Sequence, residues 1–534
     1  MKRLLLALFL ITGIGAFAQS SAGFTLSLEE ITIPNAPGVQ SFSVGQSGGK
    51  WLILGGRRDG LHQRQPFAAF LAADNNTDAF VIDPVAKQVW SQNLSSLPTS
   101  IQEQLESTNP NFYQRGNTLY IIGGYGYSNT QQDHYTYPNL TAVDVPGAID
   151  AIMNGTSLAP HFAQLTDNRL QVTGGQLGML NDTFYLVGGQ NFIGRYNPMG
   201  PTHGPGFFQE YSNEIRMFEI NGSGSSLSIG NYSAIRDTVN LHRRDYNMMP
   251  QIFPDGSHGF TVFTGVFQYA ADLPYLNCVD IKNGSYNVIP NFEQRLSHYH
   301  SAKLGVWESS QNKVHDIFFG GIAQYYLDAQ GLLVEDFDVP FVKTISRVTR
   351  FSNDSLVEYD MGIEMPDYLG ASAEFIPLES APFTHGEILD LDALPVGRHL
   401  VGHIYGGIQS TQGNIFFINN GNQSHASSRV FEVYVDLGAT HTARPNSSDA
   451  IRLEISPNPA TGKVIVQAWV EEAGDYQIIV NDIQGKVLLQ TSAQMSAGAR
   501  NVEEIQLDSL SSGVYFITLR NGKLQQTKRL ELSR

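Results

Sequence analysis

The sequence contains a single cysteine, Cys278, in 534 residues. One thiol cannot form an internal disulfide, so the stability of the chain has to come from packing. Basic residues are also scarce, because 33 Lys and Arg stand against 50 Asp and Glu and leave a formal net charge of −17. Nucleic acid and anionic membranes are therefore not expected as partners, since phosphate recognition needs concentrated Lys and Arg.

Long apolar runs are scarce as well, and the longest stands at the start of the chain. Residues 1–18 combine two basic residues, an apolar run and a small-x-small site. This pattern predicts a secretory signal peptide that is cleaved before Gln19. No cysteine stands at the signal boundary, which excludes lipoprotein attachment. No later stretch approaches the roughly 20 apolar residues of a membrane span, so no transmembrane segment is predicted and the mature chain is expected to be soluble.

A β-rich apolar run that ends in glycine recurs six times along the chain. The copies are KWLILGG (ending at Gly56), RGNTLYIIGG (Gly124), DTFYLVGG (Gly189), GFTVFTG (Gly265), HDIFFGG (Gly321) and GHIYGG (Gly407). Six copies indicate a repeat architecture. Tandem glycine weakens a strand, and close approach of backbones near a crowded axis would account for its presence.

A second β segment follows each copy and usually closes on an acidic residue, and a third often ends at proline. The acidic ends are Asp83, Asp144, Glu219, Asp280 and Asp436, and the prolines are Pro98, Pro290 and Pro366. Proline stops a strand because it has no N–H for the ladder. With the strand that precedes each glycine pair, this pattern gives four strands per unit, the signature of a propeller blade.

These units resemble the kelch repeat, in which glycines end an inner strand and an acid-ended strand follows, sometimes with a tryptophan such as Trp90. The resemblance covers Phe24 to Leu437, although Thr264 replaces one glycine and most units lack the tryptophan. The units are longer than the kelch period of about 50 residues, and the excess is expected in loops. The prediction is an all-β protein in which residues 19–440 form a six-bladed, kelch-like β-propeller.

The two ends of the repeat region indicate how such a ring would close. The first β segment, Phe24 to Pro34, has no glycine unit before it, and the last unit ends at Asp436 without an outer strand. The N-terminal strand is therefore expected to complete the sixth blade, which leaves no free sheet edge.

Residues 441–450 are small, polar and proline-bearing, as in a linker, and residues 451–534 alternate apolar and polar residues between turns. This alternation predicts a small C-terminal β-sandwich (Ig-like) domain. The domain closely resembles the type A C-terminal sorting domain of bacterial type IX secretion. The resemblance is carried by Ser456 to Pro459, Gly485 to Val487, Leu507 to Tyr515 and Lys523 to Leu530. It implies that residues 451–534 engage the type IX secretion machinery, and that the chain crosses the inner membrane by its signal peptide and then the outer membrane, to be secreted or displayed on the cell surface.

Loops that follow the glycine pairs and loops that approach the inner strands emerge on one face of a propeller, and such loops usually carry binding residues. Here they are rich in Arg, His, Tyr and Gln, which suit a sugar or an anionic ligand through stacking and forked hydrogen bonds. The candidate ligand-binding residues are Arg57, Arg58, Tyr125, Arg243, Tyr246, His298, His300, Gln324 and Tyr325. The competing interpretation is that long loops pack on one another and these side chains only hold the rim.

Neither a metal site nor a cofactor is predicted. His298 and His300 would lie on one side of an extended segment, but no third ligand is identifiable. Asp74 to Asp78 begins like an EF-hand loop, yet Ala79 and Val85 stand where that loop needs glycine and glutamate, so it is interpreted as an Asx-rich turn. No nucleophile elbow or HExxH motif is present, and catalytic residues stay unassigned.

The expected function is binding of a glycan or protein ligand by an exported propeller. One alternative is a kelch-propeller enzyme acting on a sugar, similar to sialic acid mutarotases. The copper-radical oxidases are another, because their kelch propellers use a tyrosine crosslinked to a cysteine. Cys278, however, lies in an expected strand, where it is interpreted as a small packed hydrophobe. A further alternative is a structural or adhesive surface protein without a discrete pocket.

Overall fold

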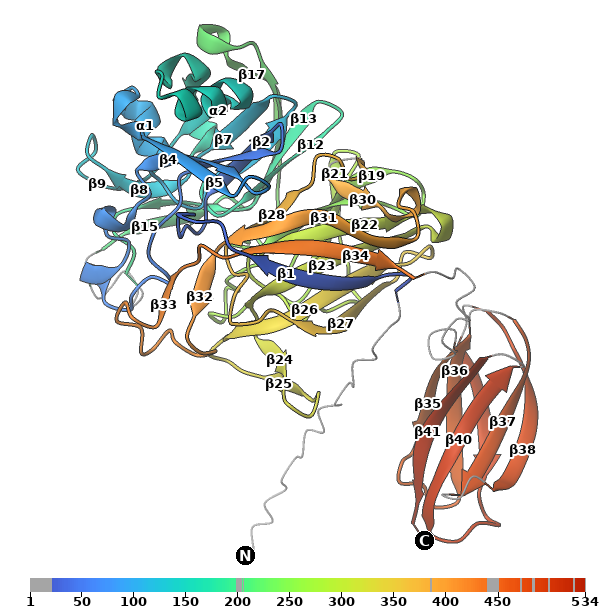
Figure 1. Cartoon of the computed structure of the whole chain (residues 1–534). Helices are drawn as coiled ribbons and strands as arrows, with labels where there is room; N and C mark the ends of the chain where they lie inside the picture. Colours follow the sequence, from blue (N-terminus) through green and yellow to red (C-terminus); the bar gives the residue numbers. More distant parts are fainter. Residues whose placement is uncertain are drawn as a thin grey trace, which may run out of the picture. The chain divides into compact units, whose positions relative to one another are not determined.

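The computed structural model describes residues 22–197, 204, 206–384, 387–438, 451–470, 473–482, 486–497, 500–521 and 524–533. The predicted signal peptide, residues 1–18, and the predicted linker, residues 441–450, lie outside them. The protein is all-β, and contacts divide it into two compact units, Leu26–Asp436 and Leu437–Arg534 (Figure 1). Each unit is described by itself.

Six sheets, each with four successive main strands and called sheets 1 to 6, form the main part of the first unit. Sheet 1 contains β2 (Ser43–Ser47), β3 (Lys50–Leu54), β4 (Asp78–Asp83) and β5 (Gln88–Asn93). Sheet 2 contains β6 (Asn111–Arg115), β7 (Thr118–Ile122), β10 (Asn139–Asp144) and β11 (Phe162–Thr166). Sheet 3 contains β12 (Gln176–Leu180), β13 (Thr183–Val187), β16 (Glu214–Asn221) and β17 (Ser228–Arg236). Sheet 4 contains β18 (Asn247–Ile252), β19 (His258–Phe263), β20 (Cys278–Lys282) and β21 (Ser285–Val288).

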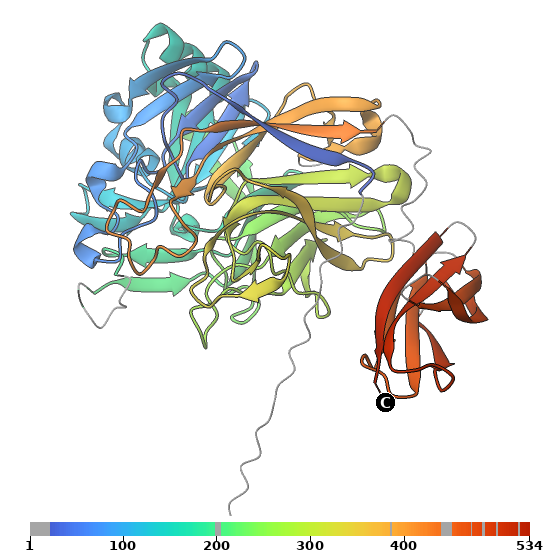
Figure 2. The same ribbon diagram turned by 60° about the horizontal axis from the view of Figure 1, so that its bottom comes forward.

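Sheets 5 and 6 depart from this simple order. Sheet 5 contains β22 (Lys303–Glu308), β23 (Lys313–Ile322), β26 (Phe341–Arg350) and β27 (Leu356–Glu364). Two short strands, β29 (Phe383–Thr384) and β30 (Ile388–Asp390), extend it, and β30 pairs parallel to β22. Sheet 6 contains β28 (Ala373–Pro377), β31 (Gly397–Gly406), β34 (Val430–Leu437) and, as its outer member, β1 (Thr25–Ile31). Both views show blue β1 alongside orange β34, so the N-terminal strand pairs with the last unit as the sequence predicted (Figures 1 and 2).

The sheets pack against one another in chain order, because successive sheets contribute to common apolar clusters. Leu52 of sheet 1 shares a cluster with Ile121 of sheet 2, and Met249 of sheet 4 shares one with Phe318 of sheet 5. Helices α1 (Thr99–Leu105) and α2 (Val145–Asn154) add apolar side chains to the cluster between sheets 1 and 2. Sheet 6 also packs against sheet 1, since Tyr405 and Trp51 lie in one cluster with ring centroids 5.9 Å apart.

The glycine pairs are explained by backbone conformation as well as by close approach. All five pairs have positive φ, and in the fourth unit, which lacks a pair, Thr264 takes φ 56° before Gly265. The Thr264 hydroxyl lies 2.8 Å from the His298 carbonyl, which helps to hold a conformation that threonine rarely adopts. At Gly123 a Cβ would lie 1.7 Å from the carbonyl oxygen of Val172, so no side chain fits there.

Short strands in the long loops build further structure next to the sheets. One extra sheet combines β8 (Tyr125–Ser128), β9 (Asp133–Thr136), β14 (Gln190–Ile193) and β15 (Phe208–Tyr211). Two hairpins are β24 (Tyr325–Leu327) with β25 (Leu333–Glu335), and β32 (Ile408–Ser410) with β33 (Ser424–Ala426). Each of these strands lies in the loop after the second strand of its unit, so these loops contain regular secondary structure of their own.

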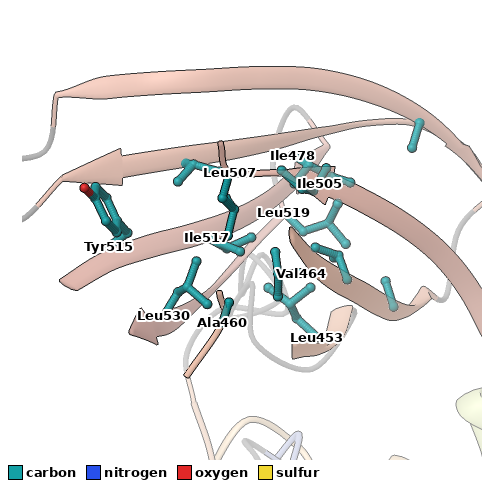
Figure 3. Packing of buried hydrophobic residues seen from close by; sticks show 14 of the residues in the cluster. Leu453, Ala460, Val464, Ile478, Ile505, Leu507, Tyr515, Ile517, Leu519 and Leu530 are labelled. Atoms are coloured by element: carbon teal, nitrogen blue, oxygen red, sulfur yellow. The ribbon is translucent and has the colours of Figure 1, made fainter. Parts of the chain in front are cut away.

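The second unit consists of two facing sheets. One contains β35 (Ile451–Ser456), β36 (Lys463–Val470) and β39 (Arg500–Gln506). The other contains β37 (Gly474–Asp482), β38 (Val487–Met495), β40 (Gly513–Asn521) and β41 (Leu524–Leu532). Side chains from both sheets, such as Leu453, Val464, Ile478 and Leu519, form one apolar core between them (Figure 3). This arrangement is the β-sandwich that the alternating pattern predicts.

Candidate ligand-binding cavity

A cavity of about 1040 Å³ opens among the loops that follow the second strands and the loops that approach the first strands. All six sheets contribute loops to it, through Arg57 (sheet 1), Tyr125 (sheet 2), Phe192 (sheet 3), Tyr269 (sheet 4), Phe337 (sheet 5) and Phe417 (sheet 6). Its volume lies at the upper end of the range of small-molecule sites, about 300–1000 Å³. It therefore has room for a ligand of several rings.

A narrower space of about 170 Å³ adjoins this cavity, and the two share Ser41, Asn109, Asp245 and His300. Residues of β2, β6, β12, β18, β22 and β28, the first strand of every sheet, line the narrow space. Glu374 and Lys303 lie there with His300, whose Nε2 is 3.0 Å from Glu374 Oε1. Burial alone would raise the pKa of Glu374, but its interactions with His300 and Lys303 outweigh burial and hold this pKa below its ordinary value. Glu374 therefore stays ionised near neutral pH in the narrow space.

One wall of the cavity is a packed group of aromatic rings from the loops of sheets 1 to 3. Phe70 and Tyr125 meet edge to face at 5.4 Å, and Phe192 stacks on Phe207 at 4.7 Å. His62 stacks on Phe70 and meets Tyr196 edge to face. Burial lowers the pKa of His62 to about 4, so its ring is uncharged near neutral pH. This wall is apolar and rigid, because each ring is held by at least one other.

A guanidinium and a carboxylate also line the cavity. Arg244 donates from Nε to the hydroxyl of Tyr211 at 3.1 Å, pairs through Nη1 with Asp245, and lies over the ring of Phe267. Its side chain is 12% exposed and lines the cavity. A forked donor beside a carboxylate can exchange hydrogen bonds with neighbouring hydroxyls of a ligand, because one group donates and the other accepts.

Three parallel rings stand next to this pair. His242 lies between Tyr211 and Tyr269, with centroid distances of 3.8 and 3.9 Å. Burial, followed by the nearby charge of Arg244, lowers the pKa of His242 to about 4. The stack is therefore uncharged near neutral pH and fixes the plane of Tyr269.

Three of the nine predicted site residues, Arg57, Tyr125 and His300, line the cavity. Arg57 is only 3% exposed and its guanidinium forks onto Asp59, so it holds the loop. The Tyr125 hydroxyl donates to the Gly194 carbonyl at 2.7 Å. Of the three, His300 faces both spaces and is the best placed for contact with a ligand.

The other six predicted residues do not line the cavity, because their side chains serve the loops and the sheet packing. Arg58 lies over the ring of Phe80, Arg243 bonds to Asn277, and the Tyr246 hydroxyl donates to the Val187 carbonyl. His298 uses one ring nitrogen on the Gln294 carbonyl and the other on the backbone N–H of Gln324. Gln324 and Tyr325 both donate to Glu335. For these six, the competing interpretation of rim-holding side chains describes their contacts.

The loops named from the sequence contribute to the cavity, but several residues that line it were not predicted. Arg244, Asp245 and His242 lie in the same run as Arg243, and Tyr299 lies next to His300. Arg244 lines the cavity together with the adjacent Asp245, whereas Arg243 does not, so a choice between the two arginines requires the backbone conformation of the loop. The only sequence feature that could have indicated Arg244 was its place beside the predicted Arg243.

Among the described residues, no group of three or more His, Cys, Asp or Glu side chains could hold a metal ion. At the EF-hand-like run, the Asn76 amide donates to the Gly55 and Asp78 carbonyls, so it braces the turn. Cys278 packs with Phe263 and Phe318 away from the cavity, and burial raises the pKa of its thiol to about 12. The thiol is therefore a packed, unreactive side chain.

The second unit is similar to a known protein family, and this similarity concerns where the chain is exported. Residues 454–532 match the family described as the secretion system C-terminal sorting domain. The tail is similar to a sorting domain. Such a domain indicates export through the type IX system to the cell surface or the extracellular space, and interaction with that machinery. No helix in the described ranges is long and apolar enough to cross a membrane.

No curated protein matches the chain at a significant level. Solved structures with some likeness include "Structure of YjhT", at 11% identity, 76% of this chain, 99% of that one and a TM-score of 0.41. A copper-bound fungal alcohol oxidase of the AA5 family is 9% identical, with 96% and 100% covered and a TM-score of 0.37. A family 43 arabinoxylan arabinofuranohydrolase from Bacillus subtilis, in complex with cellotetraose, is 11% identical, with 93% and 95% covered and a TM-score of 0.31. TM-scores this low identify no activity for this chain.

Proposed function

We propose that the first unit is a closed, six-bladed, kelch-like β-propeller and that the protein is an exported glycan-binding protein. Three observations support the ring. The first strands of all six sheets line one narrow space, sheet 6 packs on sheet 1, and β1 from the N-terminal end pairs in sheet 6. A ring of this kind leaves no sheet edge unpaired at the junction of the chain ends.

The lining of the cavity is the observation that supports a glycan as the ligand. The stacked plane of Tyr269 stands beside the donor Arg244 and the acceptor Asp245, in a cavity with room for several rings. Sugars present an apolar C–H face and a polar edge of hydroxyls, so a site for them needs both an aromatic surface and paired donors and acceptors. A concave site also fits a glycan better than the broad surface of a folded protein.

A glycan array probed with the purified full-length mature protein tests this function. We expect binding to a defined subset of glycans, and Arg244→Gln should weaken it about tenfold or more, because a hydrogen bond to a charged group contributes ~1.5–3 kcal/mol. Arg169→Gln is the matched control, since Arg169 pairs with Asp167 and does not line the cavity. Absence of binding to every glycan, or equal loss in both variants, contradicts the proposal.

A sugar-acting enzyme is the second candidate, and the Tyr211 hydroxyl favours it. This hydroxyl accepts from Arg244 Nε at 3.1 Å and from the backbone N–H of Phe267 at 3.4 Å, so its own proton is free to point elsewhere. With Asp245 as a nearby carboxylate, the cavity holds a potential acid and a potential base, which is enough for ring opening of a reducing sugar. Anomer exchange followed by NMR on the sugars that bind would detect it, and rates equal to the uncatalysed reaction would contradict it.

A further inference from the structure

Three aromatic rings at the mouth of the cavity are largely exposed. Tyr269, Phe337 and Phe417 are 64%, 67% and 53% exposed, and all three line the cavity. They lie on the loops that follow the second strands of sheets 4, 5 and 6. Large exposed apolar groups that gather at one place commonly mark a binding surface.

The cavity rings from sheets 1 to 3 are more enclosed. They pack on one another: Tyr125 and Phe192 are 5% and 2% exposed, and Phe70, Tyr196 and Phe207 are half-buried. Among the described rings that line the cavity, the largely exposed ones therefore all come from the loops of sheets 4 to 6.

Two of the exposed rings are held in place before any ligand arrives. Tyr269 stacks on His242, which stacks on Tyr211, so one face of Tyr269 stays free in a fixed orientation. Phe417 lies under the guanidinium of Arg64 at 4.8 Å and against Phe416. Rings fixed in advance lose less entropy when a ligand stacks on them.

We propose that the ligand is an extended neutral glycan chain, one end of which enters the cavity while later sugars cross the rim and stack on Tyr269, Phe337 and Phe417. This inference rests on the proposed glycan-binding function. A single sugar inside the cavity cannot stack on all three rings, because the rings come from loops of three successive sheets at the mouth of the cavity. The formal net charge of −17 disfavours a polyanionic chain, because like charges repel at low salt.

The test measures binding of the full-length mature protein to oligosaccharides of one to six sugars by calorimetry, with oligomers of β-glucan, xylan, mannan and chitin as probes. Affinity is expected to rise with length for at least one series. Tyr269→Ala, Phe337→Ala and Phe417→Ala should each weaken the hexamer about threefold to tenfold, the range for one aromatic contact, while leaving the shortest binding oligomer unchanged. Phe208→Ala is the control, because Phe208 is 50% exposed and does not line the cavity.

The outcomes separate this inference from the function on which it rests. If the monosaccharide binds as tightly as the hexamer and the rim variants match the wild type, while Arg244→Gln still loses affinity, the extended-chain inference is wrong and the glycan function stands. If no oligosaccharide binds, and a protein is the ligand instead, both are wrong. Tyr269→Phe keeps the ring and should restore hexamer binding, which distinguishes lost stacking from a disturbed loop.

Discussion

The buried carboxyl of Asp316 gives a quantitative prediction about pH and stability. Asp316 lies on β23 and is fully buried, in contact with sheet 4. Its Oδ2 accepts from the Gln251 amide at 2.8 Å, while Oδ1 has no hydrogen-bond partner among the described residues. Burial raises the pKa of Asp316 from 3.8 to about 7, because an uncompensated carboxylate is poorly solvated there.

The sign of the effect follows from proton uptake on folding. Between pH 4 and pH 7 the folded protein keeps the Asp316 proton that the unfolded chain releases, so the free energy of unfolding falls as the pH rises and levels off above pH 7. One pKa unit corresponds to about 1.4 kcal/mol, which gives a loss of ~3 kcal/mol between pH 5 and pH 8.

Asp316→Asn should remove this loss, because the amide keeps an acceptor for Gln251 and carries no charge. Relative to the wild type, the variant should gain ~3 kcal/mol of stability on going from pH 5 to pH 8. The assay is urea unfolding of the full-length protein at both pH values, followed by circular dichroism. Asp150→Asn, an exposed position on α2, is the control and should show no such gain. A variant whose stability relative to the wild type is the same at both pH values would refute the reasoning.

Three further predictions concern the repeat, the ring and the tail. Gly123→Ala should lower the free energy of unfolding in urea by ~3 kcal/mol or more, because its Cβ would meet the Val172 carbonyl. Gly116 has positive φ but open space around it, so Gly116→Ala should lower this free energy by ~1–2 kcal/mol. Equal losses would contradict the packing explanation. Removal of β1 should lower the melting temperature of the first unit by several degrees, since it exposes the edge of β34; an unchanged melting curve refutes the closure. A chain that lacks β41 should accumulate in the periplasm with its first unit folded, as judged by fractionation and proteolysis; normal surface display contradicts the sorting role.

The strand pattern of the first unit could be predicted because each unit carries its own local signal. The apolar run before each glycine pair is the second strand of a sheet in the structure, and the acid-ended segment is the third. The glycines have positive φ and end or interrupt the regular pairing of the second strand, so the sequence signal and the backbone geometry have one cause. The N-terminal strand was found in sheet 6 by counting, since one unit lacked an outer strand.

The loop structure could not be predicted, because it depends on contacts between units. The pairing of β9 with β14 joins loops of sheets 2 and 3, and β30, from the segment between the first two strands of sheet 6, pairs with β22 of sheet 5. None of these short strands has a period or a turn signal of its own that identifies its partner.

The site was predictable only as a set of loops. Of the two predicted histidines, His300 lines the cavity, whereas His298 is fully buried and bonded to backbone groups. Likewise, Arg244 lines the cavity and the adjacent Arg243 does not. The composition of the loops therefore predicted which loops surround the cavity, but only the backbone conformation decides which of their side chains line it.

A crystal structure of the mature protein soaked with the best-bound array glycan tests the central claim most directly. The account predicts glycan density in the 1040 Å³ cavity, with a sugar ring against Tyr269 and hydroxyls within hydrogen-bond distance of Arg244 and Asp245. Glycan density confined to another surface, with the cavity unchanged, would contradict it.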